Sequence, residues 1–170
     1  MTLPSVEALI EKLTQALTPV FSSSDPQPII VGIETGGAWI AERLHQAIAP
    51  AAELGRLNIS FYRDDFTRTG LHPTIKPSSL PVNIDDKVII LVDDVLHSGR
   101  TVRAAMNEIF DYGRPKRILL VILIDRGERE IPIQADIVAE TIKLDPNTHI
   151  KLEGPDPLSL TLKTLESDAG

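Results

Sequence analysis

The sequence predicts an α/β fold in which helices flank a parallel, twisted β-sheet. Short apolar runs such as 29–33 and 118–124 have the length and composition of strands that are buried on both faces. Segments with helical periodicity alternate with these runs, as parallel sheets require. The chain has 170 residues, enough for one domain with a substantial core. We therefore expect a single domain over residues 1–170.

The first third of the chain contributes two helices and two strands to this prediction. Apolar residues at steps of three and four predict a helix over 4–17. A polar loop leads to the buried strand 29–33. A second helical segment follows and ends before Pro50, because the residue before a proline disfavours helical geometry. Alternating apolar and polar residues over 57–62 predict the second strand.

Residues 63–86 have a different composition. The stretch contains Pro73, Pro77 and Pro81 and few periodic apolar residues, so we expect a long loop with room for a short hairpin. Long loops inside compact domains are uncommon and are often functional lids. We therefore interpret 63–86 as a candidate functional lid.

Strands and helices continue to alternate in the second half. The predicted elements are a strand over 87–92, a helix over 101–112, strands over 117–124 and 134–138, and possible edge strands at 150–152 and 158–162. Ligands of parallel sheets bind beyond the carboxyl ends of the strands. The candidate loops are therefore 34–37, 93–100 and 125–129.

Composition excludes several classes of function. There are no cysteines, which removes disulfides, thiolate catalysis and cysteine-bound zinc, and the four histidines are not spaced like a metal cluster. No apolar run approaches the length of a membrane span, and the N-terminus does not resemble a signal peptide, so we expect a cytoplasmic protein with no membrane partner. The formal net charge of −7 disfavours nonspecific nucleic-acid binding, although it does not exclude a local basic patch.

The segment 89–101 (IILVDDVLHSGRT) carries the clearest chemistry. A strand ends in Asp93 and Asp94, and a Ser- and Gly-containing turn then opens a helix at Thr101. A helix N-terminus presents free N–H groups and a positive dipole end, which favour a phosphate. Two adjacent carboxylates suit sugar hydroxyls, bound directly or through Mg²⁺. The alternative is a purely structural strand–turn–helix with an acidic turn.

Other glycines, arginines and turns have structural alternatives as well. Gly36 and Gly37 could serve only to let a helix pack close to its strand. Arg63 could be a surface ion-pair partner, and the 125–127 turn has an ordinary turn composition. Trp39 is expected to pack as core or interface.

The segment 89–101 resembles the phosphoribosyl-pyrophosphate (PRPP) motif of type I phosphoribosyltransferases. The wider chain is similar to the PyrR family of bifunctional pyrimidine-operon regulators and uracil phosphoribosyltransferases. The matching stretches are 33–44, 59–65, 81–105, 113–115 and 124–135. An aromatic residue at the place of His97 is usual in this branch.

The resemblance implies a role for each matching position. Asp93 and Asp94 would bind the ribose hydroxyls and, through them or through water, Mg²⁺. Residues 63–86 would form a flexible hood over the carboxyl ends of the strands, and Arg63 would act with the two aspartates from this hood. The 5-phosphate loop would consist of His97, Ser98, Gly99, Arg100 and Thr101. The pyrophosphate loop would consist of Glu34, Thr35, Gly36 and Gly37. The base pocket would include Arg126, Ile137 and Val138.

The resemblance also implies an activity, with two alternatives. The expected reaction forms UMP and pyrophosphate from uracil and PRPP with Mg²⁺, in a homodimer or homotetramer. One alternative is an RNA-binding regulator of pyrimidine-operon attenuation that responds to uridine nucleotides, and another is a phosphoribosyltransferase for a different base. The first predicted helix contains Glu7, Glu11 and a single Lys12, so RNA binding is disfavoured. Glu34 also departs from the basic residues that regulators carry in the pyrophosphate loop.

Overall fold

Parallel strands form the sheet at the centre of the structure, in the order β2-β1-β3-β4-β5. The computed structural model describes residues 1–59, 78–81 and 83–165. The strands span Ile29–Ile33 (β1), Leu54–Leu57 (β2), Val88–Leu96 (β3), Arg117–Asp125 (β4) and Ile137–Thr141 (β5). The predicted parallel sheet is confirmed.

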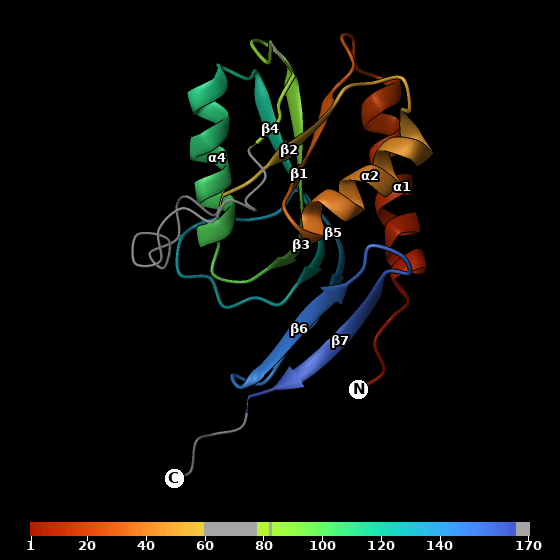
Figure 1. Cartoon of the computed structure of the whole chain (residues 1–170), viewed down its shortest axis with the longest axis vertical. Helices are drawn as coiled ribbons and strands as arrows, with labels where there is room; N and C mark the ends of the chain where they lie inside the picture. Colours follow the sequence, from red (N-terminus) through yellow and green to blue (C-terminus); the bar gives the residue numbers. More distant parts are fainter. Residues whose placement is uncertain (60–77, 82, 166–170) are drawn as a thin grey trace.

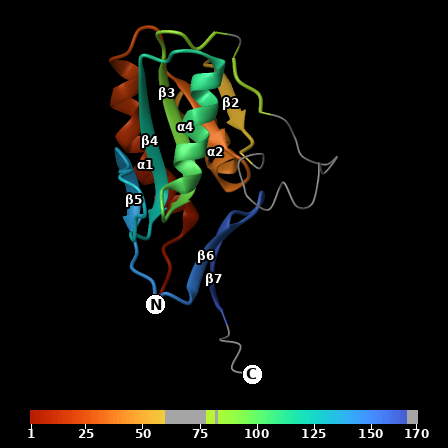
Figure 2. The ribbon, with the colours of Figure 1, turned by 90° about the vertical axis from the view of Figure 1, so that its left-hand side faces the viewer.

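Helices cover both faces of this sheet. α1 (Val6–Ser22) and α2 (Gly36–Ile48) lie on one face, and α4 (Arg100–Tyr112) lies on the other (Figures 1 and 2). This arrangement confirms the predicted α/β fold class. No helix in the described part of the chain is long and apolar enough to cross a lipid bilayer.

Alternate side chains of β1 belong to two different cores. Ile30 packs with residues of α1 and α2, whereas Ile29, Val31 and Ile33 pack with residues of α4. Successive residues of a strand point to opposite faces, so a strand covered on both sides needs apolar residues at nearly every position. All of β1 is buried accordingly, which explains the unbroken apolar run that predicted it.

Helix α1 extends about one turn beyond the predicted range 4–17. It continues through Pro19 and ends at Ser22, and the N–H of Ser23 donates to the carbonyl of Pro19 at 3.1 Å. Proline removes one helical N–H donor. The added turn brings Phe21 into the core at 5% exposure, and we attribute the continuation to that apolar contact.

The predicted strand 57–62 is misplaced. The strand β2 covers Leu54–Leu57, because its residues pair in parallel register with residues 30–33 of β1. The alternating pattern that predicted a strand over 57–62 is still present in the burial of the side chains, since Leu57 and Ile59 are both buried. Ile59 nevertheless belongs to no strand, and residues 60–62 lie outside the described residues. Similarly, the strand predicted at 134–138 is found at Ile137–Thr141.

The two segments predicted as edge strands form a separate sheet. β6 (Thr148–Glu153) and β7 (Ser159–Thr164) pair antiparallel with each other, and neither joins the parallel sheet in the described structure. Alternation of apolar residues reveals a strand but not its partner. Both strands are confirmed, and each is an edge strand of this two-stranded sheet. This β6–β7 hairpin lies beyond the carboxyl ends of the strands, next to the start of α2 (Figure 1).

Most of the predicted hood, 63–86, lies outside the described residues, including 63–77 and residue 82. In the part that is described, Ser79 pairs with Arg56 of β2 in an isolated antiparallel bridge. Ile84 is 1% exposed and packs in the core beneath α4. These contacts attach the end of the stretch to the fold, and its role as a hood stays a prediction.

Candidate active site

The strand order reverses between β1 and β3. The chain runs from β1 outward to β2, then returns to the other side of β1 for β3 and continues to β4 and β5. Ligands of open α/β sheets bind at the carboxyl ends of the strands where such a reversal occurs. The loops that leave β1 and β3 are 34–35 and 97–99. Two of the three loops predicted from sequence therefore meet at the switch point.

The start of α2 packs directly against the acidic end of β3. A Cβ atom on Gly37 would lie 2.5 Å from the carbonyl oxygen of Val92 and 3.0 Å from the Cα of Asp93. A Cβ atom on Gly36 would collide with the carboxylate of Asp94. The glycines therefore permit a close approach that any side chain would block. The packing interpretation of Gly36 and Gly37 is confirmed, and their place in a pyrophosphate loop stays a prediction.

The acidic pair is held by the backbone around it. Asp93 is 5% exposed and its Oδ1 accepts from the N–H of Asp94 at 2.8 Å. The Oδ1 of Asp94 accepts from the N–H of Val95, also at 2.8 Å. These bonds fix the direction of both side chains.

The loop 97–99 ends in a left-handed residue that starts α4. Gly99 has φ +92°, and a Cβ atom there would lie 3.1 Å from side-chain atoms of Ile131 and Ile133. Both the backbone geometry and the space favour glycine. The hydroxyl of Ser98 accepts from the N–H of Arg100 at 3.2 Å, which tightens the turn before the helix.

The segment after β4 braces this loop. The guanidinium of Arg129 donates to the carbonyl of His97 at 3.0 Å, to the carbonyl of Ile133 at 2.8 Å and to Oδ2 of Asp125 at 2.7 Å. Partial burial works to raise the pKa of Asp125, but the bonds from Arg129 and from the N–H of Gly127 outweigh it and lower that pKa. Arg129 thus ties the two loops together through a charged group.

Two further contacts join the same segments at the surface. Nε2 of His97 lies 3.3 Å from Oε2 of Glu128. The side chain of Arg100 bonds to the carboxylate of Glu130, and this bond is the main cause of the lowered pKa of Glu130. Both pairs are solvent-exposed, so they orient the loop more than they stabilise the fold.

The acidic residue of the glycine loop has a basic partner. NH1 of Arg56, on β2, lies 3.5 Å from Oε1 of Glu34. The N–H of Glu34 also donates to the carbonyl of Leu57 at 2.8 Å, which holds the loop beside β2. The peptide bond between Glu34 and Thr35 is cis. The loop 34–37 contains no basic residue of its own, but the fold places Arg56 beside it.

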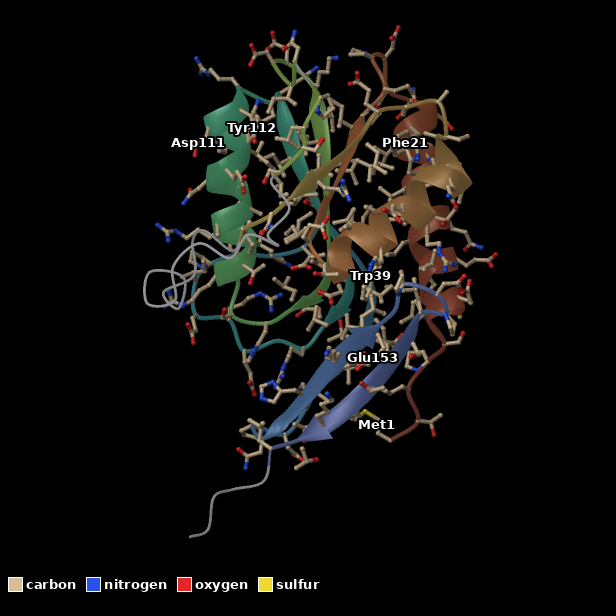
Figure 3. All side chains as sticks on the ribbon, in the orientation of Figure 1. Met1, Phe21, Trp39, Asp111, Tyr112 and Glu153 are labelled. Atoms are coloured by element: carbon tan, nitrogen blue, oxygen red, sulfur yellow. The ribbon has the colours of Figure 1, made fainter. Side chains whose placement is uncertain are left out.

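These segments surround a cleft of about 430 Å³. It brings together six of the predicted site residues: Glu34, Thr35, Gly36, Asp93, Asp94 and Thr101. Its remaining walls are formed by Ile33, Trp39, Val95, Lys151 and Leu152. The ring of Trp39 sits between α2 and the β6–β7 hairpin (Figure 3), and a Cβ atom on Gly154 would lie 2.9 Å from it. The predicted core or interface position of Trp39 is thus also a wall of the cleft.

The other predicted site residues do not line this cleft. His97, Ser98, Gly99 and Arg100 form the adjacent loop, and Gly37 lies beneath the cleft against β3. Arg63 lies outside the described residues.

The residues predicted for a base pocket lie on neighbouring strands. Val138 is level with Asp93, because both pair with Ile122 of β4, so two strand spacings of about 4.8 Å separate them. Ile137 packs into the core on the α1 side. Arg126 is 4% exposed, and its Nε has no hydrogen-bond partner among the described residues. None of the three lines the cleft.

A buried carboxyl lies outside the cleft on α4. Glu108 is 9% exposed and accepts a hydrogen bond from the hydroxyl of Ser78. That hydroxyl in turn accepts from the N–H of Asn58 at 2.8 Å. Burial raises the pKa of Glu108, against the lowering effect of Ser78, and nearby Asp111 adds to the rise. The network connects α4 with the chain on both sides of residues 60–77.

Sequence reasoning missed three cations of this region. Arg56, Arg129 and Lys151 come from β2, the loop after β4, and β6. Arg129 falls in the 125–129 loop that was singled out, so its place at a strand end was an available signal. Arg56 and Lys151 carried no local signal, because each reaches the site only through long-range strand placement.

Comparison with known proteins agrees with this geometry. A model of the phosphoribosyl transferase domain matches residues 3–153. The chain is 48% identical over 165 residues to the bifunctional protein PyrR of Nitrosococcus oceani, covering 95% of this chain and 93% of that protein. It is 49% identical over 166 residues to the bifunctional protein PyrR of Pseudomonas paraeruginosa, covering 97% and 98%.

A solved structure shares the fold. The hypoxanthine-guanine phosphoribosyltransferase of Bacillus anthracis aligns with a TM-score of 0.64 at 24% identity, covering 84% of this chain and 81% of that one. At this identity the likeness concerns the fold alone. The domain match and the near full-length relatives go further: the chain belongs to the phosphoribosyl transferase domain family and, within it, to the PyrR family.

Proposed function

We propose that the protein is a uracil phosphoribosyltransferase that forms UMP and pyrophosphate from uracil and PRPP. The observation that carries the proposal is the cleft at the switch point, where an acidic pair meets a glycine loop beside a phosphate-type helix start. A sugar that carries a 5-phosphate, two hydroxyls and a pyrophosphate needs these three kinds of group. The choice of uracil rests on membership of the PyrR family.

The proposed reaction joins a uracil nitrogen to the anomeric carbon of PRPP. The new C–N bond forms as the C–O bond to pyrophosphate breaks, pyrophosphate leaves with the electron pair of that bond, and the nitrogen passes its proton to solvent water. Asp93 and Asp94 accept hydrogen bonds from the ribose hydroxyls and hold the ring in place. Positioning of this kind removes much of the entropic barrier, and oriented charges stabilise the cationic transition state.

Phosphate binding is assigned to the two loops. Backbone N–H groups of 98, 99 and 101 would hold the 5-phosphate at the start of α4, where the helix dipole favours an anion. In the loop 34–37, the N–H groups of 35–37 would face the leaving pyrophosphate, because the N–H of Glu34 donates to Leu57. Arg63 is proposed to add charge to that group from the hood, so Arg63→Ala should lower turnover by well over a few-fold. Turnover within a few-fold of wild type contradicts this role.

The acidic pair also suits Mg²⁺. No group of three or more His, Asp or Glu side chains in the described residues is arranged to hold a metal by itself. Mg²⁺ is usually bound by one or two carboxylates together with substrate phosphates, and Asp93 and Asp94 fit that pattern. When bound with PRPP, Mg²⁺ would neutralise the charge that develops on pyrophosphate.

Base selectivity is the finest part of the proposal. Val138 lies level with Asp93, and Arg126 is buried with an unpaired Nε among the described residues, so both stay candidates for the base pocket along with Ile137. The test is turnover with Mg²⁺ and PRPP against uracil, cytosine, hypoxanthine and guanine in parallel. We expect kcat/KM for uracil to exceed the others by at least about 100-fold, as a base-specific hydrogen-bonding site should. Preference for another base would contradict the assignment of uracil as substrate and leave the phosphoribosyltransferase activity as proposed.

A second candidate activity is RNA binding, because the relatives are named bifunctional. The attenuation of pyrimidine-operon transcription that the family implies would require a basic surface. On α1, however, the single Lys12 is paired with Glu140 of β5 at 3.1 Å. We therefore expect little RNA affinity from this region. A salt titration of RNA binding separates the cases, since a steep negative slope of log K against log salt supports binding and a slope near zero excludes it.

A further inference from the structure

The β6–β7 hairpin contributes a wall of the cleft although it lies outside the parallel sheet. Its residues Lys151 and Leu152 line the same space as the glycine loop and the acidic pair. In both ribbon views the hairpin sits beyond the carboxyl ends of the strands (Figures 1 and 2). A residue on this hairpin can therefore face a ligand from the side opposite the sheet.

The position of the hairpin is fixed by packing on its apolar face. Ile150 and Leu152 are 8% and 3% exposed and belong to the core shared with α1 and α2. Gly154 lies against the ring of Trp39. NH2 of Arg43 on α2 lies 3.9 Å from Oδ1 of Asp156 in the hairpin turn. These contacts hold β6 at a set place over the cleft.

Lys151 lies on the polar face, between the two buried residues. Its side chain is 59% exposed, and its Nζ is 4.0 Å from Oε1 of Glu153, at the limit of an ion pair. Exposed pairs of this length contribute little. The ammonium group is therefore available to a stronger anion that enters the cleft.

A phosphate ligand needs a cation at this cleft, because most of the charged side chains that line it are negative. Three carboxylates line it, those of Glu34, Asp93 and Asp94, and Lys151 is the one basic residue among its described lining residues. Arg56 compensates Glu34 from outside. A polyphosphate that approaches this acidic wall needs a cation that faces it, and a lysine on a flexible stem adapts to phosphate as a point charge.

We propose that Lys151 binds the pyrophosphate group of PRPP, an inference that rests on the proposed function. The choice of pyrophosphate over 5-phosphate follows from the neighbours of Lys151. It shares the cleft with residues 34–36 and Trp39 at the start of α2. Of the segment 97–101, to which the 5-phosphate is assigned, only Thr101 lines the cleft, whereas 97–100 lie outside its lining.

The test compares two ligands, Mg²⁺-pyrophosphate and ribose 5-phosphate, by calorimetric titration without uracil. The variants are Lys151→Gln and Lys151→Arg, and the matched control is Lys163→Gln. Lys163 is on the same polar face of the hairpin, opposite His149, and does not line the cleft. Lys151→Gln and Lys163→Gln each remove one positive charge from the same hairpin, so the two variants have similar long-range charge effects. Lys151→Arg keeps the charge. Thermal midpoints within about 2 °C of wild type confirm intact folding.

We expect Lys151→Gln to weaken pyrophosphate binding by about tenfold or more, as the loss of one charge-assisted bond should. Ribose 5-phosphate binding should change by less than about twofold, Lys151→Arg should recover most of the affinity, and Lys163→Gln should resemble wild type. In turnover assays the KM for PRPP should rise more than kcat falls.

Equal pyrophosphate affinity in wild type and Lys151→Gln overturns the proposal. So does an equal loss of both ligands, which would show a general effect on the cleft. The titration involves no base, so its outcome is independent of base choice. Failure of wild type to turn over uracil would refute the uracil activity and leave the pyrophosphate contact standing.

Discussion

The two glycines at the start of α2 predict opposite consequences for the same substitution. Gly37→Ala places a methyl group 2.5 Å from the carbonyl oxygen of Val92 and 3.0 Å from the Cα of Asp93. Both obstacles are backbone, so helix and strand must move apart. Overpacking of this kind costs about 1–3 kcal/mol, which for a chain of this size lowers Tm by about 2–12 °C.

Gly36→Ala meets a different obstacle. Its methyl group would collide with the carboxylate of Asp94, the far end of a side chain that can rotate away. Alanine also favours the helix by up to about 1 kcal/mol, so we expect Tm to stay within about 2 °C of wild type. The carboxylate that binds ribose in the proposed reaction is displaced, however, and a shift of about 1 Å costs about 100-fold in rate.

The assay measures kcat/KM for PRPP and Tm for three variants, with Gly113→Ala as the control. A Cβ atom on Gly113 would lie 2.7 Å from Oδ1 of Asp85, at the opposite end of the sheet from the cleft. This control should lose stability and keep the KM for PRPP. Gly36→Ala with wild-type kcat/KM would refute the reasoning, because it would mean that the Asp94 carboxylate does not need its observed place.

Further predictions concern charged groups around the cleft and the core. Arg129→Lys should cost about 1.5–3 kcal/mol in urea unfolding and raise the KM for PRPP, because lysine cannot reproduce the planar fork that joins the loops. The lowered pKa of Asp125 means that its stabilisation is present above pH 3.8 and is lost as pH falls, so wild type and Arg129→Met should converge in stability in acid. The raised pKa of Glu108 means that its carboxyl holds a proton more tightly in the folded state, so the free energy of unfolding falls as pH rises above 4.5. Glu108→Gln should therefore raise Tm relative to wild type more at pH 8 than at pH 5. An equal rise in Tm at both pH values contradicts this direction of the pKa shift. Arg56→Ala should raise the KM for PRPP, because the negative charge of Glu34 is then no longer compensated. Adding Glu34→Gln to this variant should lower the KM again in part. Additive increases in KM from the two substitutions would exclude this coupling.

Local sequence patterns predicted the elements that the sheet buries completely. The runs that became β1, β3 and β4 are apolar at nearly every position, and only a strand covered by helices on both faces needs that composition. The loops after β1 and β3 followed directly, since a parallel sheet places their starts at one edge. The predicted meeting of these loops is observed in the close approach of Gly36 to Asp94.

Long-range pairing was beyond local patterns. The position of β2 depends on its register with β1, and the hairpin partner of β6 depends on which strand arrives antiparallel. The same limitation concealed Arg56, which reaches Glu34 only because the two strands lie side by side. A charge pattern in sequence reports composition, whereas ion pairs depend on this register.

The acidity of the chain therefore bears less on anion binding than the sequence suggested. A net charge of −7 is spread over the whole chain, and at physiological salt exposed charges are screened beyond about 8 Å. Within that range the loop charge of Glu34 is compensated by Arg56 at 3.5 Å. What remains at the loop is the start of α2, whose first N–H groups have no partner within the helix and lie at its positive dipole end. An acidic residue in the proposed pyrophosphate loop is thus compatible with a phosphate site, provided that β2 keeps its arginine.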